Sequence, residues 1–91
     1  MNAPFQLPEG WRHIERPPSL FRRFQFSSYS ETRAFLDRLA ALSEEADLYP
    51  DLGFGPKHAN VTINANASGA IGARETDFAS RAAELAGEAA P

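Results

Sequence analysis

The chain has 91 residues, of which 43% are hydrophobic and 23% charged, and its formal net charge at pH 7 is −3. This length accommodates one small domain with a modest core, and the absence of cysteine excludes disulfides and Cys-based zinc sites, so no metal-dependent role is expected. No basic run supports nucleic-acid binding, and no apolar stretch approaches the roughly 20 residues of a membrane span, so we expect a cytosolic protein that binds neither nucleic acid nor membrane.

The first part of the chain predicts an arm and two strands. Two prolines disfavour a helix in residues 1–9, which we expect to form a flexible arm. Residues 11–16 predict a short strand with Trp11 and Ile14 on its core side, ended by the two prolines that follow. Residues 20–26 alternate aromatic and polar side chains, as a strand with one buried face does.

A helix is predicted to begin within Ser28-Tyr29-Ser30-Glu31, because this segment offers N-cap residues and a Ser-x-x-Glu capping box. Pro50 is expected to end the helix, because a proline disfavours helical geometry in the residue before it. Between these points, apolar residues recur at three- and four-residue steps and form one inward stripe: Phe35, Leu36, Leu39, Leu42 and Ala46.

Two strands and a second helix follow. Residues 52–56 predict a short, glycine-containing strand and turn, residues 74–86 predict a helix, and residues 88–91 predict a frayed tail. Residues 58–64 alternate strictly between polar and apolar side chains, so the polar ones are expected to share one face of a strand: His58, Asn60, Thr62 and Asn64.

These elements predict an α+β fold. The order is strand, strand, helix, strand, strand, helix, which forms a two-layer sandwich when a four-stranded antiparallel sheet carries both helices on one face. Residues 10–87 are expected to form this single domain.

Several short motifs occur along the chain in a distinctive order and spacing: Gly10-Trp11, Phe24-x-Phe26, Phe35-Leu36, Pro50, Val61-Thr62-Ile63, Gly72 and Asp77-Phe78-Ala79. In this order and spacing they resemble the pterin-4a-carbinolamine dehydratase family. The resemblance implies the fold just described, with the family's N-terminal helix short or absent, and association through the sheet edge into a homodimer.

The chain departs from this family at its catalytic positions. The resemblance places the family's His-His-Pro on Leu48-Tyr49-Pro50 and its third histidine on Asn60. Dehydration needs groups that exchange protons near neutral pH, which imidazole does with a pKa of about 6.5. Leucine and asparagine do not titrate there, and a tyrosine phenol ordinarily titrates near about pH 10. We therefore expect a degenerate pocket with no catalytic residue, no cofactor and negligible dehydratase activity.

Four further segments have a bearing on the branch of the family: Arg16-Pro17-Pro18-Ser19-Leu20, Tyr49-Pro50, Phe54-Gly55 and Asn60-Val61-Thr62-Ile63. They resemble a non-catalytic branch, the RuBisCO assembly factor encoded beside α-carboxysome genes. This resemblance implies a chaperone for the RuBisCO large subunit in the bacterial cytoplasm, associated with the carboxysome.

The candidate partner-binding surface combines the polar face of the 58–64 strand with two nearby aromatic residues, Tyr49 and Phe54. The alternative for the polar face is plain solvation, and for Phe54 a place in the core is expected ahead of an interface role. Two other functions stay open: an active pterin dehydratase that uses Tyr49, Asn60 and His58 in an altered arrangement, and a co-regulator that stabilises dimers of a transcription factor.

Overall fold

The computed structural model describes residues 10–66 and 69–89. It confirms the predicted order of strands and helices and the α+β two-layer sandwich. The predicted N-terminal arm, the end of the predicted tail and the question of a first helix lie outside the described residues. The elements are β1 (Arg12–Glu15), β2 (Pro18–Gln25), α1 (Tyr29–Ala46), β3 (Asp51–Gly55), β4 (His58–Asn64) and α2 (Ala73–Ala89).

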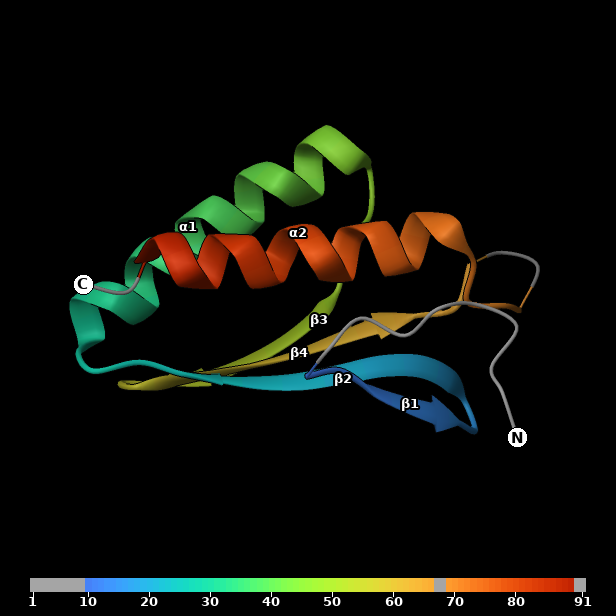
Figure 1. Ribbon diagram of the computed structural model, residues 1–91, viewed down its shortest axis with the longest axis horizontal. Helices are drawn as coiled ribbons and strands as arrows, with labels where there is room; N and C mark the ends of the chain where they lie inside the picture. Colours follow the sequence, from blue (N-terminus) through green and yellow to red (C-terminus); the bar gives the residue numbers. More distant parts are fainter. Residues whose placement is uncertain (1–9, 67–68, 90–91) are drawn as a thin grey trace.

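The sheet is antiparallel throughout, and its strands lie in the order β1-β2-β4-β3. The long strands β2 and β4 therefore form the centre, and the short strands β1 and β3 form the two edges. Both helices pack on the same side of this sheet (Figure 1). The other side, which we call the open face, has no helix over it among the described residues. No helix in the described part of the chain has the length and apolarity that a membrane span requires.

The hydrophobic core lies between the helices and the sheet. Val61 and Ile63 of β4 are fully buried, as are Phe35 of α1 and Ala82 of α2. The ring of Phe24 lies 4.8 Å from that of Phe35, which joins the sheet to α1. Phe24, Phe35, Val61 and Ile63 come from positions of the predicted periodic patterns, so local alternation and helical spacing place these side chains in the core.

The edge strand β1 differs from its prediction. Trp11 is buried and meets Phe24 edge to face at 5.9 Å, as expected of a core residue. Ile14, however, is paired with Ser19, which places its side chain on the open face and outside the core cluster. The prediction for Ile14 was wrong because side chains alternate along a strand, so residues 11 and 14 cannot share a face. The two prolines also interrupt strand pairing for fewer residues than expected, because Pro18 is already the first residue of β2 and pairs with Glu15.

The predicted start of α1 is confirmed, but its end is not at Pro50. Ser28 is the N-cap, and its side chain accepts a hydrogen bond from the Glu31 backbone N–H at 3.2 Å. The helix ends at Ala46, and the cap residue Asp47 has φ 54° and donates its backbone N–H to the Ser43 carbonyl. A left-handed cap residue thus ends the helix before the proline can act.

A buried polar group fixes the position of α1. The buried hydroxyl of Thr32 in α1 donates to the Pro56 carbonyl at 2.9 Å, which connects this helix to the β3–β4 turn.

Helix α2 runs to Ala89, beyond the predicted end near residue 86 and into the predicted tail. Its alanine-rich final turns favour helix, and the glycine at residue 87 alone does not end it.

Candidate functional site

The open face of β4 carries the four polar side chains expected there. Burial alternates along the strand, with Ala59, Val61 and Ile63 fully buried on the helix side. The polar residues therefore point away from the helices, each beside a residue of β2 on the same face. The pairs across the two strands are His58 with Gln25, Asn60 with Arg23, Thr62 with Phe21 and Asn64 with Ser19.

Glycines on β3 leave one side of this polar row unobstructed. Gly53 is the partner of Asn60, and Gly55 is the partner of His58. A methyl group on Gly55 would come within 2.4 Å of the His58 ring, so the imidazole lies over this glycine. Asn60 carries a buried Oδ1 with no hydrogen-bond partner among the described residues. Asn64, at the end of the row, donates to the Asp51 carboxylate at 2.8 Å.

The edge strand β3 presents apolar side chains on its other face. Leu52 and Phe54 pair with Val61 and Ala59, on the helix side of the sheet, yet they are 47% and 60% exposed. Tyr49, in the segment that leads into β3, is 66% exposed. The expectation that Phe54 belongs to the core is therefore wrong. The alternation of side chains along β3 places Phe54 on the helix side of the sheet, as for a core residue. It is nevertheless exposed, because the helices do not cover this edge strand.

The three positions assigned to a degenerate pocket do not come together. Leu48 is partly buried and packs against the core on the helix side of the sheet. Asn60 lies on the open face, and Tyr49 is exposed between β3 and α1. His13 pairs with Leu20 on the helix side, whereas His58 lies on the open face, so the sheet also separates the two imidazoles. Residues 10–66 and 69–89 contain no cluster of three or more metal-ligating side chains.

A polar cluster at the start of α2 was missed from the sequence. Glu75 is 1% exposed, and its Oε1 accepts hydrogen bonds from the Gly72 backbone N–H at 2.7 Å and from Asn66 Nδ2 at 3.3 Å. The available signal was the glutamate half of a capping box: Gly72 stands three residues before Glu75 but has no side chain to complete the motif. Arg74 binds the carbonyls of Ala46 and Asp47 at the end of α1. These contacts join three segments and account for the buried carboxylate structurally.

A groove of about 430 Å³ lies between the two helices. Leu42 and Leu85 contribute apolar surface to it, and an ion pair of 2.6 Å joins Arg81 to Glu45 across it. The hydrogen bond to Glu45 raises the pKa of Arg81, so the guanidinium remains charged. The groove contains no imidazole and no nucleophile, and its geometry gives no indication of chemistry.

Comparisons with known proteins agree on one family. The family model of pterin 4 alpha carbinolamine dehydratase matches residues 2–85. A putative pterin-4-alpha-carbinolamine dehydratase of Rhodopseudomonas palustris is 29% identical over 79 residues, which cover 87% of this chain and 78% of the relative. A protein of the same description from Natronomonas pharaonis is 32% identical over 81 residues, which cover 89% of this chain and 86% of that one.

Two solved structures have the same fold. The first is reported as a pterin dehydratase-like protein identified as a RuBisCO assembly factor in the alpha-carboxysome. It is 48% identical, with a TM-score of 0.79 over 87% of this chain and 92% of that one. The second is a transcriptional coactivator/pterin dehydratase from Brucella melitensis, 19% identical, with a TM-score of 0.79 over 86% of this chain and 83% of that one. At that identity the second structure establishes the fold alone.

Proposed function

The chain belongs to the pterin 4 alpha carbinolamine dehydratase family, and we propose that within this family it is a non-catalytic assembly chaperone for the RuBisCO large subunit. The observation that carries the proposal is its 48% identity to the RuBisCO assembly factor of the alpha-carboxysome, over nearly the whole length of both chains. The proposal includes a bacterial, carboxysome-associated location and needs no cofactor.

The arrangement of the former catalytic positions supports the non-catalytic part of the proposal. Each positioned acid or base contributes roughly 10²- to 10⁴-fold to a rate. Leu48 offers no proton, and Asn60 is on the opposite side of the sheet from it. Neither of the two histidines lies where the family's motif would place an imidazole.

The edge strand β3 supports a homodimer. Its outer edge offers backbone N–H and C=O groups to a second chain, and Leu52 and Phe54 present exposed apolar surface beside that edge. Two copies that pair β3 with β3 across a two-fold axis would continue the sheet and bury both side chains. We therefore assign Phe54 to the contact between copies.

The client-binding surface in this proposal is the open face of β4 with the neighbouring aromatic Tyr49. The polar row from His58 to Asn64 has no helix over it among the described residues, and its β3 neighbours Gly53 and Gly55 carry no side chain that would cover it. Tyr49 adds an exposed aromatic anchor, a residue type that is favoured in interfaces.

Co-expression tests the proposal. RuBisCO large and small subunits are produced in a bacterial host with and without this chain, and assembled enzyme is measured by native gel and carboxylase activity. We expect more assembled enzyme when the chain is present, at an equal total amount of large subunit. An unchanged yield would contradict the proposal.

Dehydratase activity is the second candidate function, because curated relatives near 30% identity carry that description. A turnover assay on the pterin carbinolamine decides between the two, with an active member of the family as reference. A rate comparable to the reference would establish the enzyme. The substitutions Tyr49→Phe and His58→Gln would then show whether these side chains act in it.

A further inference from the structure

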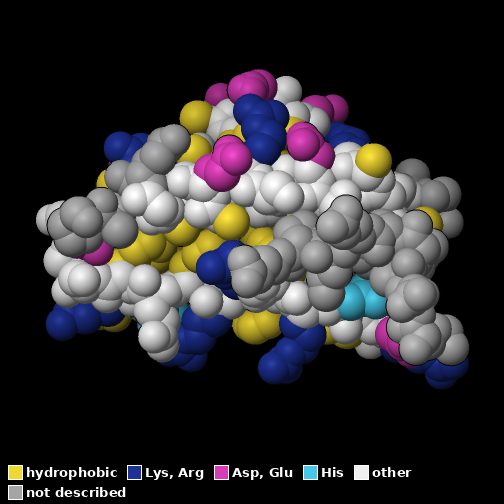
Figure 2. Space-filling model, in the orientation of Figure 1, with side chains coloured by type: hydrophobic (Ala, Val, Ile, Leu, Met, Phe, Trp, Pro, Cys, Tyr) yellow, Lys and Arg dark blue, Asp and Glu magenta, His cyan; other side chains and the backbone are white. Residues whose placement is uncertain are grey.

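The two layers of the molecule carry opposite charge. Helix α1 and residues 73–87 of α2 contain seven acidic and four basic side chains, a net charge of −3. Figure 2 shows acidic side chains gathered over the helices and basic ones along the sheet side. Residues 10–27 and 51–64, which form the sheet and its turns, have a net charge of +3, because Glu15 and Asp51 stand against five basic residues: Arg12, Arg16, Arg22, Arg23 and Lys57.

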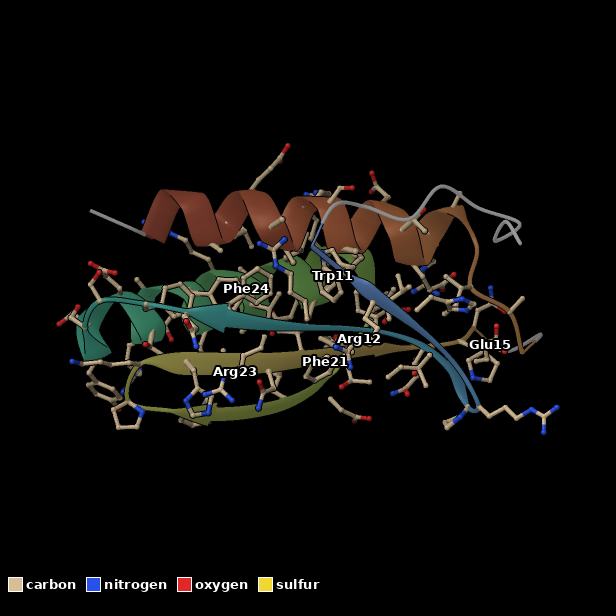
Figure 3. The ribbon with its side chains drawn as sticks, turned by 60° about the horizontal axis from the view of Figure 1, so that its bottom comes forward. Trp11, Arg12, Glu15, Phe21, Arg23 and Phe24 are labelled. Carbon is tan, nitrogen blue, oxygen red and sulfur yellow. The ribbon has the colours of Figure 1, made fainter. Side chains whose placement is uncertain are left out.

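Two arginines of the sheet are exposed on the open face, one on either side of an aromatic ring. Arg12 on β1 is the direct partner of Phe21 on β2, and Arg23 follows Phe21 by two residues, so all three share this face. Figure 3, turned to bring the open face forward, shows them along the two strands. Both arginines are exposed, and the half-buried ring lies between them.

Neither Arg12 nor Arg23 is used inside the described part of the chain. No hydrogen bond or ion pair joins either side chain to another described residue. Other arginines are engaged: Arg22 points to the helix side with its guanidinium 4.5 Å from the centre of the Phe24 ring, and Arg81 is paired with Glu45. Within residues 10–66 and 69–89, these two guanidinium groups on a basic face therefore have no partner and are exposed.

We propose that Arg12 and Arg23 dock an acidic, extended segment of the protein client on the open face, with Phe21 as the apolar surface between them. This inference rests on the proposed function for the nature of the client. Strand spacing places the two arginine backbones about 8 Å apart, close to the roughly 7 Å between alternate residues of an extended chain. Acidic residues two positions apart in the client can thus reach both guanidinium groups, each of which binds a carboxylate through two hydrogen bonds.

A peptide fits this face better than a nucleic acid does. Nucleic-acid affinity comes from many phosphate contacts, which two arginines do not supply. Two unpaired arginines match a short pair of carboxylates instead. The polar row of β4 lies alongside and can hydrogen-bond the backbone of the bound segment.

The direct test measures binding of a fluorescein-labelled dodecapeptide of alternating Glu and Ser by fluorescence anisotropy at low salt. We expect Arg12→Glu/Arg23→Glu to weaken binding about tenfold or more. Arg33→Glu/Arg38→Glu makes the same charge change on α1, and we expect it to alter binding less than about twofold. The pair Arg12→Lys/Arg23→Lys should retain part of the affinity. Circular dichroism establishes that each variant is folded.

Equal loss of peptide affinity in both charge-reversal pairs would overturn the proposal. It would mean that the peptide responds to the net charge of the protein and does not contact Arg12 and Arg23 directly. Tighter binding of a single-stranded DNA oligomer of the same charge would overturn it too. In the unmodified chain, peptide titration should shift the amide NMR signals of residues 12 and 21–23, and unshifted signals there would also contradict the proposal.

Client assembly separates this proposal from the function on which it rests. If the chain raises the yield of assembled RuBisCO and Arg12→Glu/Arg23→Glu does so equally well, the docking proposal fails and the chaperone function stands. If the unmodified chain has no effect on assembly but binds the peptide through these arginines, the chaperone function fails and the acidic docking site stands.

Discussion

Leu48 and Asn60 lie on opposite sides of the sheet. Leu48 packs against the core beneath the helices, and Asn60 belongs to the row of polar side chains on the open face. Two positions assigned to one pocket from a family motif are thus separated by the sheet itself. Leu48 and Asn60 therefore do not line a common pocket.

Restoring histidines at the assigned positions is accordingly expected to leave the chain inactive. The triple substitution Leu48→His/Tyr49→His/Asn60→His adds three imidazoles, but the third remains on the other side of the sheet from the first. We expect carbinolamine dehydration to stay at the uncatalysed rate in a turnover assay with an active family member alongside. A rise of more than about a hundredfold, the low end of what one positioned acid or base contributes, would contradict this geometry.

The dimer prediction is tested at Phe54. Because its side chain is 60% exposed in the single chain, Phe54→Ser should change the free energy of unfolding of the protomer by less than about 1 kcal/mol. It should nevertheless shift the sedimentation mass from dimer toward monomer. Phe54→Leu, which keeps an apolar side chain, is the matched control and should remain dimeric. Unmodified protein that sediments as a monomer would refute the edge-to-edge contact.

The hydrogen bond from Thr32 to the β3–β4 turn is expected to be a specific contribution to stability. Its Oγ1 is buried and donates to the Pro56 carbonyl at 2.9 Å. Thr32→Val should lower the free energy of unfolding by about 1–2 kcal/mol in denaturant titrations, because the carbonyl loses its partner. Thr76→Val removes an exposed bond to the Ala73 carbonyl and should cost less than about 0.5 kcal/mol. A similar decrease in the free energy of unfolding in both variants would show that the buried hydrogen bond of Thr32 stabilises the protein no more than the exposed one of Thr76.

Glu75 should matter for stability and not for client binding. Glu75→Ala is expected to lower the free energy of unfolding by about 1–3 kcal/mol, because the Gly72 N–H and the Asn66 amide both lose their acceptor. Glu84→Ala, an exposed glutamate of the same helix, should change it by less than about 0.5 kcal/mol. The comparison is made by urea denaturation. A Glu75→Ala protein as stable as Glu84→Ala would remove the structural role assigned to the carboxylate.

The order of elements, the core stripe of α1 and the two faces of β4 were predictable because each depends on a local period. Alternation over residues 58–64 is sufficient to place the buried and polar side chains of that strand. The end of α1 was not predictable in the same way. Pro50 is a strong stop signal, but the left-handed backbone of Asp47 acts first, and aspartate adopts that conformation only occasionally.

The misplaced and missed residues depend on contacts that a local pattern does not contain. The alternation of side chains along β3 directs Phe54 toward the helix side, as in a core residue. Its exposure follows from the position of β3 at the edge of the sheet, which only the order of the strands reveals. Ile14 is the exception, because alternation along β1 already places it on the opposite face from Trp11. The burial of Glu75 involves Asn66, nine residues away and just beyond the end of β4.

The most direct measurement of the central claim follows the recovery of RuBisCO from its unfolded large subunit. Purified chain is added in increasing amounts as the large subunit is diluted from denaturant in the presence of small subunit, and carboxylase activity is recorded. Carbinolamine turnover is assayed on the same preparation. A non-catalytic chaperone predicts that carboxylase recovery rises with the amount of chain to a stoichiometric plateau, while turnover stays at the uncatalysed rate. Unchanged recovery together with measurable turnover would contradict the account.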